Sequence, residues 1–350
     1  MLAALTQSIR DGSELTAPEI QNAVSALAGE TESVEQKADF LTALARRGET
    51  PGEIEGFARS LRELSIQPPI DEATRNLGLI DVCGTGGDHQ NTFNISTTVA
   101  LVLASAGVPV AKHGNRAVTS KSGSADVLDA LGIQIELSPT EVAEWLRNHH
   151  FAFLFAPRFH PAFRQIVPAR KLCAQNGQRT LFNFLGPLLN PARPVAQLVG
   201  VSQPHLCEPL ARVLQALGVQ RGMVACGRVG THFLDELSTL GENTIAEFHH
   251  QRGLSVSTLS PALFPIQPVA LGDLEGGDRD TNAAVVTRIL AGEDRGPKRD
   301  AVLLNSAAAL FLAQRAKTIL EGWDLAVEIL DSGRASIKLA ELQRATRTST

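Results

Sequence analysis

The sequence has few cysteines and no long apolar run, and both absences narrow its class. None of its four cysteines, Cys83, Cys173, Cys207 and Cys226, has the C-x-x-C spacing of a zinc site or redox pair. Cys83 and Cys226 stand in apolar stretches and are predicted to be small core residues. No apolar stretch reaches the length of a transmembrane helix and no signal-peptide pattern is present, so we expect a cytoplasmic protein without a membrane partner.

The sequence also lacks an excess of positive charge. Its 32 Lys and Arg residues against 37 Asp and Glu residues give a net charge of −5. A surface that binds duplex nucleic acid needs clustered cations, so we expect no nucleic-acid partner. A hydrophobic content of 43% and a charged content of 20% are typical of a soluble globular protein. The length of 350 residues predicts one large domain plus a smaller one.

Standard nucleotide-binding and nucleophile motifs are missing as well. Residues 84–87 read Gly-Thr-Gly-Gly after an apolar stretch. This spacing is neither the G-x-G-x-x-G of dinucleotide sites nor the G-x-x-x-x-G-K-[ST] of P-loops, so nicotinamide and standard nucleoside triphosphate functions lose their support. No Ser-His-Asp or Cys-His set stands at a plausible spacing, which argues against covalent catalysis by a side chain.

What the sequence does contain is a series of strand ends that suit an anion. Residues 77–82 are predicted to form a buried strand, and the glycines that follow let backbone N–H groups approach a ligand. A helix is predicted from Thr97 to Ala106, with Asn94 and Ser96 at its start, where free N–H groups attract phosphate. A second strand, 108–111, leads into Lys-His-Gly-Asn-Arg at 112–116, and hydroxyls at 120–124 precede a helix at 125–131. Together these strand ends predict a polyphosphate site, since ligands gather at the carboxyl ends of parallel strands.

An acidic pair, Asp235 and Glu236, follows a predicted strand at 223–226. Mg²⁺ takes one or two carboxylates and keeps water and phosphate oxygens as its other ligands. Adjacent carboxylates on a loop are usually solvated, but beside a polyphosphate they predict Mg²⁺ binding.

The order of elements predicts an α/β protein. Helical periodicity fills residues 1–68, with capping-box signals at 16–19 and 50–53, and Gln-Pro-Pro at 67–69 suggests a linker. Strands and helices then alternate, which predicts a central, mostly parallel sheet. Further strands are predicted at 133–137, 151–155 and 197–201, and helices at 138–149, 281–291, 299–315 and 318–331, with the apolar 301–313 segment buried.

These motifs, taken together, resemble the anthranilate phosphoribosyltransferases. The matching segments are 84–88, 92–97, 112–118, 123–126, 160–162, 179–191, 234–238, 282–284 and 299–305. The resemblance implies a nucleoside phosphorylase/phosphoribosyltransferase type of fold. It pairs a small helical domain (1–68) with a large α/β domain (69–350), and residues 160–178 are candidates for packing with the helical domain. It also implies a homodimer formed through the helical domain.

The resemblance assigns site residues by position. Phosphoribosyl pyrophosphate contacts are implied for Gly84, Gly87, Asp88, Thr92, Asn94, Ile95, Ser96, Thr97, Lys112, His113, Gly114, Asn115, Arg116, Thr119, Ser120 and Ser124. Anthranilate contacts are implied for Gly84, Asn115 and Arg170, and ligands of two Mg²⁺ ions for Ser96, Asp235 and Glu236. Between Arg170 and Thr180 this chain is longer than the usual family pattern.

The implied reaction joins the amine of anthranilate to C1 of the ribose and expels pyrophosphate, a step of tryptophan biosynthesis. Two alternatives remain open at this point. A pyrimidine nucleoside phosphorylase shares the overall fold, but Asp235, Glu236 and residues 94–97 favour an enzyme with a pyrophosphate leaving group. A non-catalytic paralogue that binds nucleic acid would be expected to lose the glycine turn and gain a basic face.

Overall fold

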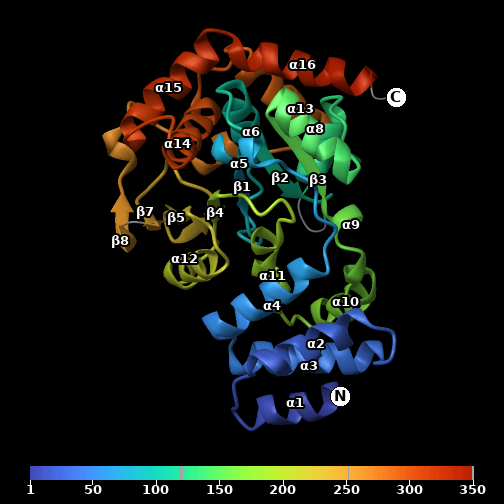
Figure 1. Cartoon of the computed structure of the whole chain (residues 1–350). Helices are drawn as coiled ribbons and strands as arrows, with labels where there is room; N and C mark the ends of the chain where they lie inside the picture. Colours follow the sequence, from blue (N-terminus) through green and yellow to red (C-terminus); the bar gives the residue numbers. More distant parts are fainter. Residues whose placement is uncertain (118–120, 251, 349–350) are drawn as a thin grey trace.

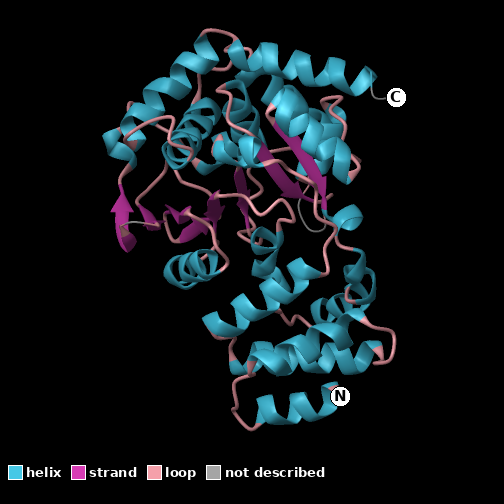
Figure 2. Cartoon of the chain, in the orientation of Figure 1, coloured by secondary structure: helices cyan, strands magenta, loops and turns pink. Residues whose placement is uncertain are grey.

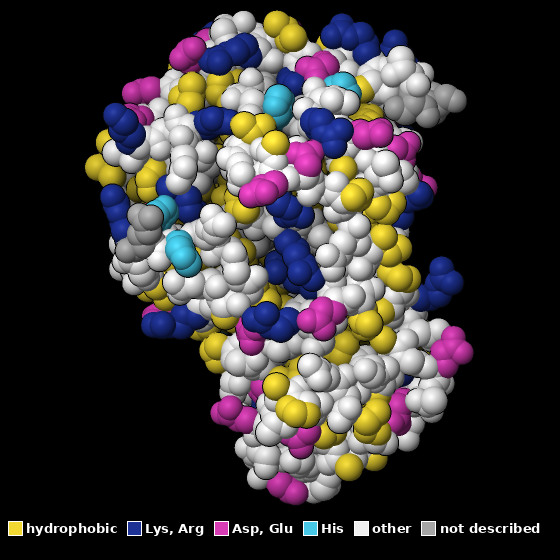
Figure 3. All heavy atoms as spheres, viewed as in Figure 1, with side chains coloured by type: hydrophobic (Ala, Val, Ile, Leu, Met, Phe, Trp, Pro, Cys, Tyr) yellow, Lys and Arg dark blue, Asp and Glu magenta, His cyan; other side chains and the backbone are white. Residues whose placement is uncertain are grey.

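The computed structural model describes residues 1–117, 121–250 and 252–348, and in this part of the chain a helical bundle lies below an eight-stranded sheet with helices on both faces (Figure 1). The two ends of the described chain lie at opposite ends of the molecule, since α1 (Leu2–Arg10) belongs to the bundle and α16 (Arg334–Thr348) to the top helix layer (Figure 1). On the face that Figure 3 shows, basic and acidic side chains are interspersed over the upper part, whereas the lower part shows mainly acidic ones.

The N-terminal bundle contains α1 (Leu2–Arg10), α2 (Ala17–Ala28), α3 (Val34–Arg47) and α4 (Pro51–Glu63). The two predicted capping boxes are confirmed. The backbone N–H of Thr16 donates to the Glu19 carboxylate at 2.8 Å, and that of Thr50 donates to the Glu53 carboxylate at 2.9 Å. These side chains close the first turn of each helix, so local sequence determines where α2 and α4 begin.

The sheet follows the order β3-β2-β1-β4-β5-β7-β8, with β6 paired to β5. Strands β3, β2, β1, β4 and β5 are parallel, and β6, β7 and β8 add antiparallel pairings, so the sheet is mostly parallel as predicted. The strands are β1 (Ile80–Gly84), β2 (Val110–Gly114), β3 (Phe151–Phe155), β4 (Ala196–Gly200), β5 (Arg221–Val229), β6 (His232–Leu234), β7 (Asn243–His249) and β8 (Gly253–Leu259).

Alternating side chains of the central strands pack into two separate hydrophobic cores. On β4, Leu198 packs into the core shared with α6 and α14, while its neighbour Val199 packs into the core shared with the N-terminal bundle. Met223 and Val224 on β5 divide in the same way, because successive side chains of a strand point to opposite faces. The sheet therefore separates a layer of late helices from α12 and the bundle (Figure 2).

The remaining α-helices connect strands or cover the sheet. None of the helices within the described ranges is both long and apolar enough to cross a membrane. The buried helix predicted around 301–313 is confirmed, since Ala301–Leu310 are all buried. The helices are α5 (Glu72–Asn76), α6 (Ile95–Ser105), α7 (Ser124–Ala130), α8 (Pro139–His149), α9 (Ala156–Phe159), α10 (Val167–Gln175), α11 (Phe182–Leu185), α12 (Cys207–Ala216), α13 (Arg279–Leu290), α14 (Pro297–Leu312), α15 (Ile319–Asp331) and α16 (Arg334–Thr348). Short 3-10 helices lie at η1 (Pro161–Gln165), η2 (Gly186–Leu189), η3 (Pro204–Leu206), η4 (Pro261–Leu263) and η5 (Leu271–Leu274).

The prediction of a strand at 133–137 is wrong. This segment makes one isolated bridge, Glu136 to Leu154, and otherwise runs as a connection between α7 and α8. Its apolar alternation is real, because Ile133, Ile135 and Leu137 are all buried. Their burial comes from packing under the helix layer rather than from a sheet ladder, and period-two patterning does not separate the two cases.

Strands β7 and β8 and helix α16 were not predicted. Most β8 side chains are exposed, so this edge strand lacks the buried alternation on which strand prediction depends. Helix α16 has few buried side chains, which include Leu339 and Leu342, and its polar character hides its helical period.

Helix α10 packs on the N-terminal bundle although it lies more than a hundred residues further along the chain. Ile166, Ala169 and Cys173 are buried in the same core as the bundle helices. The ammonium group of Lys37 on α3 donates to the backbone carbonyl of Gln165 at 3.3 Å, and Thr42 Oγ1 contacts the Cys173 sulfur at 3.6 Å. The segment that carries Arg170 is thus fixed against α3, on the bundle side of the molecule.

Candidate active site

Two adjoining cavities open at the carboxyl ends of β1 and β2. The smaller one, of about 410 Å³, is called the polar chamber here, and the larger one, of about 790 Å³, the arginine chamber. Residues 83–85 and 113–115 line both chambers. Ligands bound in the two chambers would therefore lie next to each other, on either side of these two strand ends.

Glycines at three strand ends make room for the acidic segment. A Cβ atom at Gly84 on β1 would lie 2.1 Å from Asp235 Oδ2, and one at Gly200 on β4 would lie 1.6 Å from the Asp235 carbonyl oxygen. At Gly227 on β5, a Cβ atom would lie 2.5 Å from the Glu236 carbonyl oxygen. Real Cβ atoms do not approach so closely, so the seat of the acidic pair requires glycine at all three positions.

The turn after β1 then curls over the polar chamber. Gly86 and Gly87 have φ values of +76° and +82°, a region that side chains rarely adopt. The N–H of Gly86 donates to Asp235 Oδ2 at 2.6 Å, and the N–H of Asp235 donates to Asp88 Oδ2 at 3.4 Å. The glycine turn and the acidic pair, far apart in the sequence, thus form one wall.

The amino terminus of α6 forms the floor of this chamber. Its preceding residue, Asn94, is held by the amide of Asn282 at 2.9 Å and donates to the Ser122 carbonyl at 3.3 Å. The N–H of Ser96 donates to Glu236 Oε1 at 3.2 Å. Ile95 and Thr97 are buried, so they fix the helix start rather than face open solvent. The N–H groups and the helix dipole at this end favour a bound anion.

Lys112 on β2 is the buried cation of the polar chamber, with 2% of its surface exposed. Its ammonium group donates to the Val82 carbonyl at 2.8 Å and to Ser96 Oγ at 3.3 Å. Two of its three donor hydrogens are thus used by the protein. The geometry leaves one for an anionic ligand, next to the start of α6.

The acidic residues of this wall are crowded. Burial raises the pKa of Glu236 to about 7, although Lys112 lowers it. Burial, followed by the charges of Asp88 and Glu236, also raises the pKa of Asp235 well above its usual range. Such carboxylates fit a divalent cation, which would relieve their repulsion. Within the described ranges, no three or more His, Cys, Asp or Glu side chains are arranged to hold a metal by themselves, so phosphate oxygens or water would have to complete the coordination.

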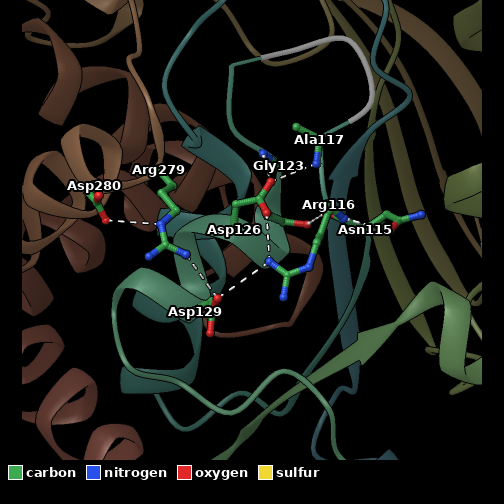
Figure 4. Close-up of polar contacts among 9 residues, drawn as sticks. Asn115, Arg116, Ala117, Gly123, Asp126, Asp129, Arg279 and Asp280 are labelled. Atoms are coloured by element: carbon green, nitrogen blue, oxygen red, sulfur yellow. Dashed lines mark hydrogen bonds and ion pairs between the residues drawn. The ribbon is translucent and has the colours of Figure 1, made fainter.

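The described ends of the loop between β2 and α7, residues 115–117 and 122–123, form the outer wall of the polar chamber. Ser124 Oγ donates to the Asn115 carbonyl at 3.4 Å, which brings the two ends of the loop together. The Arg116 guanidinium points to α7, where it lies 3.1 Å from Asp126 and 3.7 Å from Asp129 (Figure 4).

The predicted site residues converge to a large extent. Thr119 and Ser120 lie outside the described residues. The other predicted phosphoribosyl pyrophosphate contacts and metal ligands all line the polar chamber: Gly84, Gly87, Asp88, Thr92, Asn94, Ile95, Ser96, Thr97, Lys112, His113, Gly114, Asn115, Arg116, Ser124, Asp235 and Glu236. The three predicted anthranilate contacts, Gly84, Asn115 and Arg170, line the arginine chamber.

The arginine chamber takes its name from Arg158, Arg164 and Arg170, and no carboxylate is among the described residues that line it. The Arg170 guanidinium lies over the ring of Phe182, 5.2 Å from the ring centre, and burial lowers its pKa. Stacking on an aromatic face holds the planar guanidinium in one orientation. The chamber is thus suited to a flat molecule that carries a carboxylate.

A pair of histidines lies where the two chambers meet. His113 Nε2 and His160 Nε2 are 3.1 Å apart, and His113 Nδ1 lies 3.3 Å from the Gly186 carbonyl. Burial lowers the pKa of His113 to about 3 and that of His160 to about 4, so both rings are neutral at pH 7. His160 belongs to the matching segment 160–162, but no pattern in the sequence places it against His113.

A buried carboxylate, Asp81, was also missed. Its oxygens accept from the Asn190 amide at 2.8 Å and from the backbone N–H of His113 at 3.4 Å, and burial raises its pKa to about 6 despite the nearby charge of Lys112. An aspartate inside an apolar strand was the only available signal. Through its bond to His113, Asp81 connects β1 to the end of β2, which carries Lys112 and His113.

Comparison with known proteins agrees with this geometry. The helical bundle domain of a glycosyl transferase family matches residues 3–65, and the a/b domain of that family matches residues 76–336. The anthranilate phosphoribosyltransferase of Thermomicrobium roseum is 43% identical, over 98% of this chain and 96% of the relative. That of Caulobacter vibrioides is 46% identical, over 89% of this chain and 88% of the relative.

Solved structures give the same result. The anthranilate phosphoribosyltransferase of Thermus thermophilus superposes with a TM-score of 0.88 at 40% identity, and the match covers 98% of this chain and 99% of that chain. The Saccharomyces cerevisiae enzyme, solved in complex with PRPP and Mg, superposes with a TM-score of 0.87 at 27% identity, over 99% of this chain and 98% of that chain. With this fold, these two chambers and these relatives, the chain belongs to the anthranilate phosphoribosyltransferase family.

Proposed function

We propose that the polar chamber binds phosphoribosyl pyrophosphate with Mg²⁺ and that the arginine chamber binds anthranilate. The chain then transfers the 5-phosphoribosyl group to the anthranilate amine. The observation that carries this proposal is the shared wall of residues 83–85 and 113–115, which lets C1 of the ribose in one chamber face the amine in the other. The relatives described above are named for this transferase rather than for a pyrimidine nucleoside phosphorylase.

The pyrophosphate would be held mainly by groups that are fixed before it binds. Backbone N–H groups of the 84–88 turn and of the α6 start can approach its oxygens because glycine and the helix end leave them accessible. Lys112 would donate its remaining hydrogen to the same group. Such donors stabilise negative charge on the leaving group without reorganising during the reaction.

Asp235 and Glu236 would hold Mg²⁺ together with phosphate oxygens, and Ser96 would contribute its hydroxyl. The yeast relative was solved with both PRPP and Mg bound, which supports this use of the metal. We propose two ions, as the family resemblance implies, with Ser96 on α6 as a ligand of one and Asp235 and Glu236, after β6, as ligands of the other. When bound, Mg²⁺ neutralises charge on the departing pyrophosphate.

Anthranilate would be oriented by its carboxylate. Arg170 offers a planar fork that matches two carboxylate oxygens, and its stacking on Phe182 fixes the plane of that fork. Asn115 and Gly84 line both chambers, so they would contact the acceptor on the side of the reacting amine. A second structure of the yeast relative was solved in complex with 4-fluoroanthranilate, which supports an aromatic acid as the acceptor.

The chemistry asks little of an acid or base. The neutral aryl amine forms a bond from nitrogen to C1 as the bond from C1 to the pyrophosphate oxygen breaks, and the nitrogen then releases a proton. Because both histidines are neutral, they do not compete with Arg170 for the acceptor carboxylate and they add no charge beside the amine. Rate therefore comes from holding amine and C1 in line and from stabilising the leaving group.

The direct test follows anthranilate fluorescence with phosphoribosyl pyrophosphate and Mg²⁺, and again with EDTA. We expect the signal to decrease only when both substrate and metal are present. A folded protein that leaves the signal unchanged would contradict the proposal, and phosphorolysis of uridine or thymidine in its place would favour the nucleoside phosphorylase.

The assembly is part of the same proposal. We propose that residues 1–68 form the smaller domain and 69–350 the larger one. Helix α10 comes later in the chain but packs with the smaller, helical domain. The contacts of Lys37 and Thr42 with the α10 region support that packing. The family resemblance further supports a homodimer through the helical domain, which light scattering after size exclusion would test.

A further inference from the structure

Asp126, on the first turn of α7, has none of the binding or metal roles proposed so far. We propose that it is a positioning residue for phosphoribosyl pyrophosphate: its carboxylate joins residues 115–117 to residues 122–124, and these two described ends of the loop line the polar chamber. This inference rests on the proposed function, because the ligand of that chamber is part of it.

Both oxygens of the Asp126 carboxylate are used by the loop (Figure 4). Oδ2 accepts from the backbone N–H of Ala117 at 2.9 Å and from the backbone N–H of Gly123 at 2.9 Å. Oδ1 accepts from the Arg116 guanidinium at 3.1 Å. One side chain therefore binds residues that precede and follow the tip of the loop.

The two ends of the loop lie against each other at this point. A Cβ atom at Gly123 would lie 2.4 Å from the Ala117 nitrogen and 2.8 Å from the Asn115 carbonyl oxygen. The N–H of Ala125 donates to the same Asn115 carbonyl at 3.2 Å. Two N–H groups this close, from Ala117 and Gly123, need a common acceptor, and the Asp126 carboxylate supplies it.

The consequence reaches the polar chamber directly. Asp126 bonds three residues that line this chamber, Arg116, Ala117 and Gly123. Their neighbours in the chain, Asn115 and Ser124, line it as well. Losing the carboxylate would leave the Ala117 and Gly123 N–H groups unpaired and would leave Arg116 with only its longer ion pair to Asp129. The outer wall would then have to be ordered when the ligand binds, at the expense of affinity.

The charge environment agrees with this role. Burial alone would raise the pKa of Asp126, but the N–H groups of Ala117 and Gly123 and the Arg116 guanidinium lower it. The Asp126 side chain is 17% exposed, whereas that of Asp129, the next carboxylate along α7, is 43% exposed. Asp129 pairs with Arg116 at 3.7 Å and with Arg279 at 3.4 Å, and exposed pairs of this kind contribute little.

A helix cap alone would be the simplest alternative explanation. Asp126 does accept from Gly123 at the start of α7, as Glu141 accepts from the backbone N–H of Ser138 at the start of α8. Asp126 differs because it also binds Ala117, nine residues earlier. A residue that only caps α7 would affect stability when replaced, but it would not affect one substrate more than the other.

The test compares Asp126→Ala, which removes both carboxylate oxygens, with Glu141→Ala, a matched cap variant at a residue that lines neither chamber. For Asp126→Ala we expect KM for phosphoribosyl pyrophosphate to rise by roughly tenfold, the effect of leaving the Ala117 and Gly123 donors unpaired. KM for anthranilate should rise by about twofold at most, because Asn115, which Asp126 does not bond, is the only described residue of the loop that lines the arginine chamber. Glu141→Ala should lower the melting temperature without a change in KM for phosphoribosyl pyrophosphate. Equal changes of both KM values in Asp126→Ala, or the same pattern in both variants, would overturn the proposal.

A second measurement keeps the inference separate from the proposed function. Titration calorimetry of phosphoribosyl pyrophosphate with Mg²⁺, without anthranilate, should show weaker binding to Asp126→Ala than to the unaltered protein. If the unaltered protein fails to bind, the proposed function fails; if both bind equally, only the role of Asp126 fails. Should Asp126→Ala not fold, Asp126→Glu retains the charge and displaces the carboxylate. It should weaken the same binding, and unchanged binding would overturn the role.

Discussion

The two chambers of the cleft are built on opposite principles. In the polar chamber, loop, helix and strand ends are tied to one another by hydrogen bonds, such as those from Gly86 to Asp235 and from Ser96 to Glu236. The arginine chamber is about twice as large, and ring contacts add to the hydrogen bonds of its histidines: Phe163 lies edge-on to both His160 and Phe182, with ring centres 5.4 Å and 5.5 Å away.

The difference follows the chemistry of the two ligands. A polyphosphate presents many charged oxygens, so its site needs many donors that are fixed in advance. A flat aromatic acid presents one charged group and two faces, so one oriented arginine and apolar walls are sufficient. Substitutions in one chamber should therefore leave the binding of the other chamber's ligand nearly unchanged.

Replacing the buried cation should have the largest effect. Lys112→Met keeps most of the apolar stem but removes the charge from the phosphate side, so we expect kcat/KM to fall by roughly 10²–10³-fold. Steady-state kinetics with each substrate varied in turn would measure it. KM for anthranilate should remain nearly constant, and a comparable rise in that value would show that the chambers are not independent.

Removing one carboxylate of the acidic pair should lower kcat by about a hundredfold at limiting Mg²⁺, since charge stabilisation at the leaving group is lost. Asp235→Asn preserves shape and allows this comparison. Raising the Mg²⁺ concentration should restore part of the rate, because the remaining Glu236 still attracts the ion. Full activity at limiting Mg²⁺ would remove the metal role from this residue.

In the arginine chamber, Arg170→Lys keeps the charge but loses the planar fork and the stacking on Phe182. We expect KM for anthranilate to rise by roughly tenfold, with KM for phosphoribosyl pyrophosphate unchanged. Lys171→Ala, an exposed position on the same helix, serves as the control. If both variants show the same small change, Arg170 does not anchor the carboxylate.

The last expected effect concerns folded stability at low pH and leaves the separation of the two chambers untouched. The pKa of His160 is lowered to about 4 in the folded protein, against an ordinary value near 6.5, so the unfolded chain binds a proton that the folded one does not. Folded stability should therefore decrease as the pH falls below about 6.5, by about 2 kcal/mol at pH 5 for this residue. Urea unfolding at pH 7 and pH 5 would show a smaller decrease in His160→Asn. An equal decrease in both proteins would assign the acid sensitivity to other groups.

Prediction from sequence was most successful where local chemistry determines the outcome. The caps at Thr16 and Thr50 and the glycine turn at 84–87 could be predicted because each depends on neighbours in the chain. The strand at 133–137 and edge strand β8 could not be predicted correctly, because burial there depends on distant elements.

The same reasoning applies to the site. Residues of the 84–97 and 112–116 segments were found because glycines, helix starts and cations are visible in order along the chain. The contact between His113 and His160, the bond from Asn190 to Asp81 and the bond from Ala117 to Asp126 join segments that only folding brings together. No periodicity or spacing encodes such pairs, so a single sequence does not show them.

The three glycines beneath the acidic pair have a consequence for the order of folding. Gly84, Gly200 and Gly227 belong to β1, β4 and β5, and the backbone of Asp235 and Glu236 fits only over all three together. More than a hundred residues separate Gly84 on β1 from Gly200 on β4. The pairing of these two strands is therefore a slow, non-local step of folding. We expect the ability to bind Mg²⁺ with phosphoribosyl pyrophosphate to return only in the last phase of refolding, which stopped-flow measurements would show. Recovery of binding before the sheet signal is complete would contradict this order.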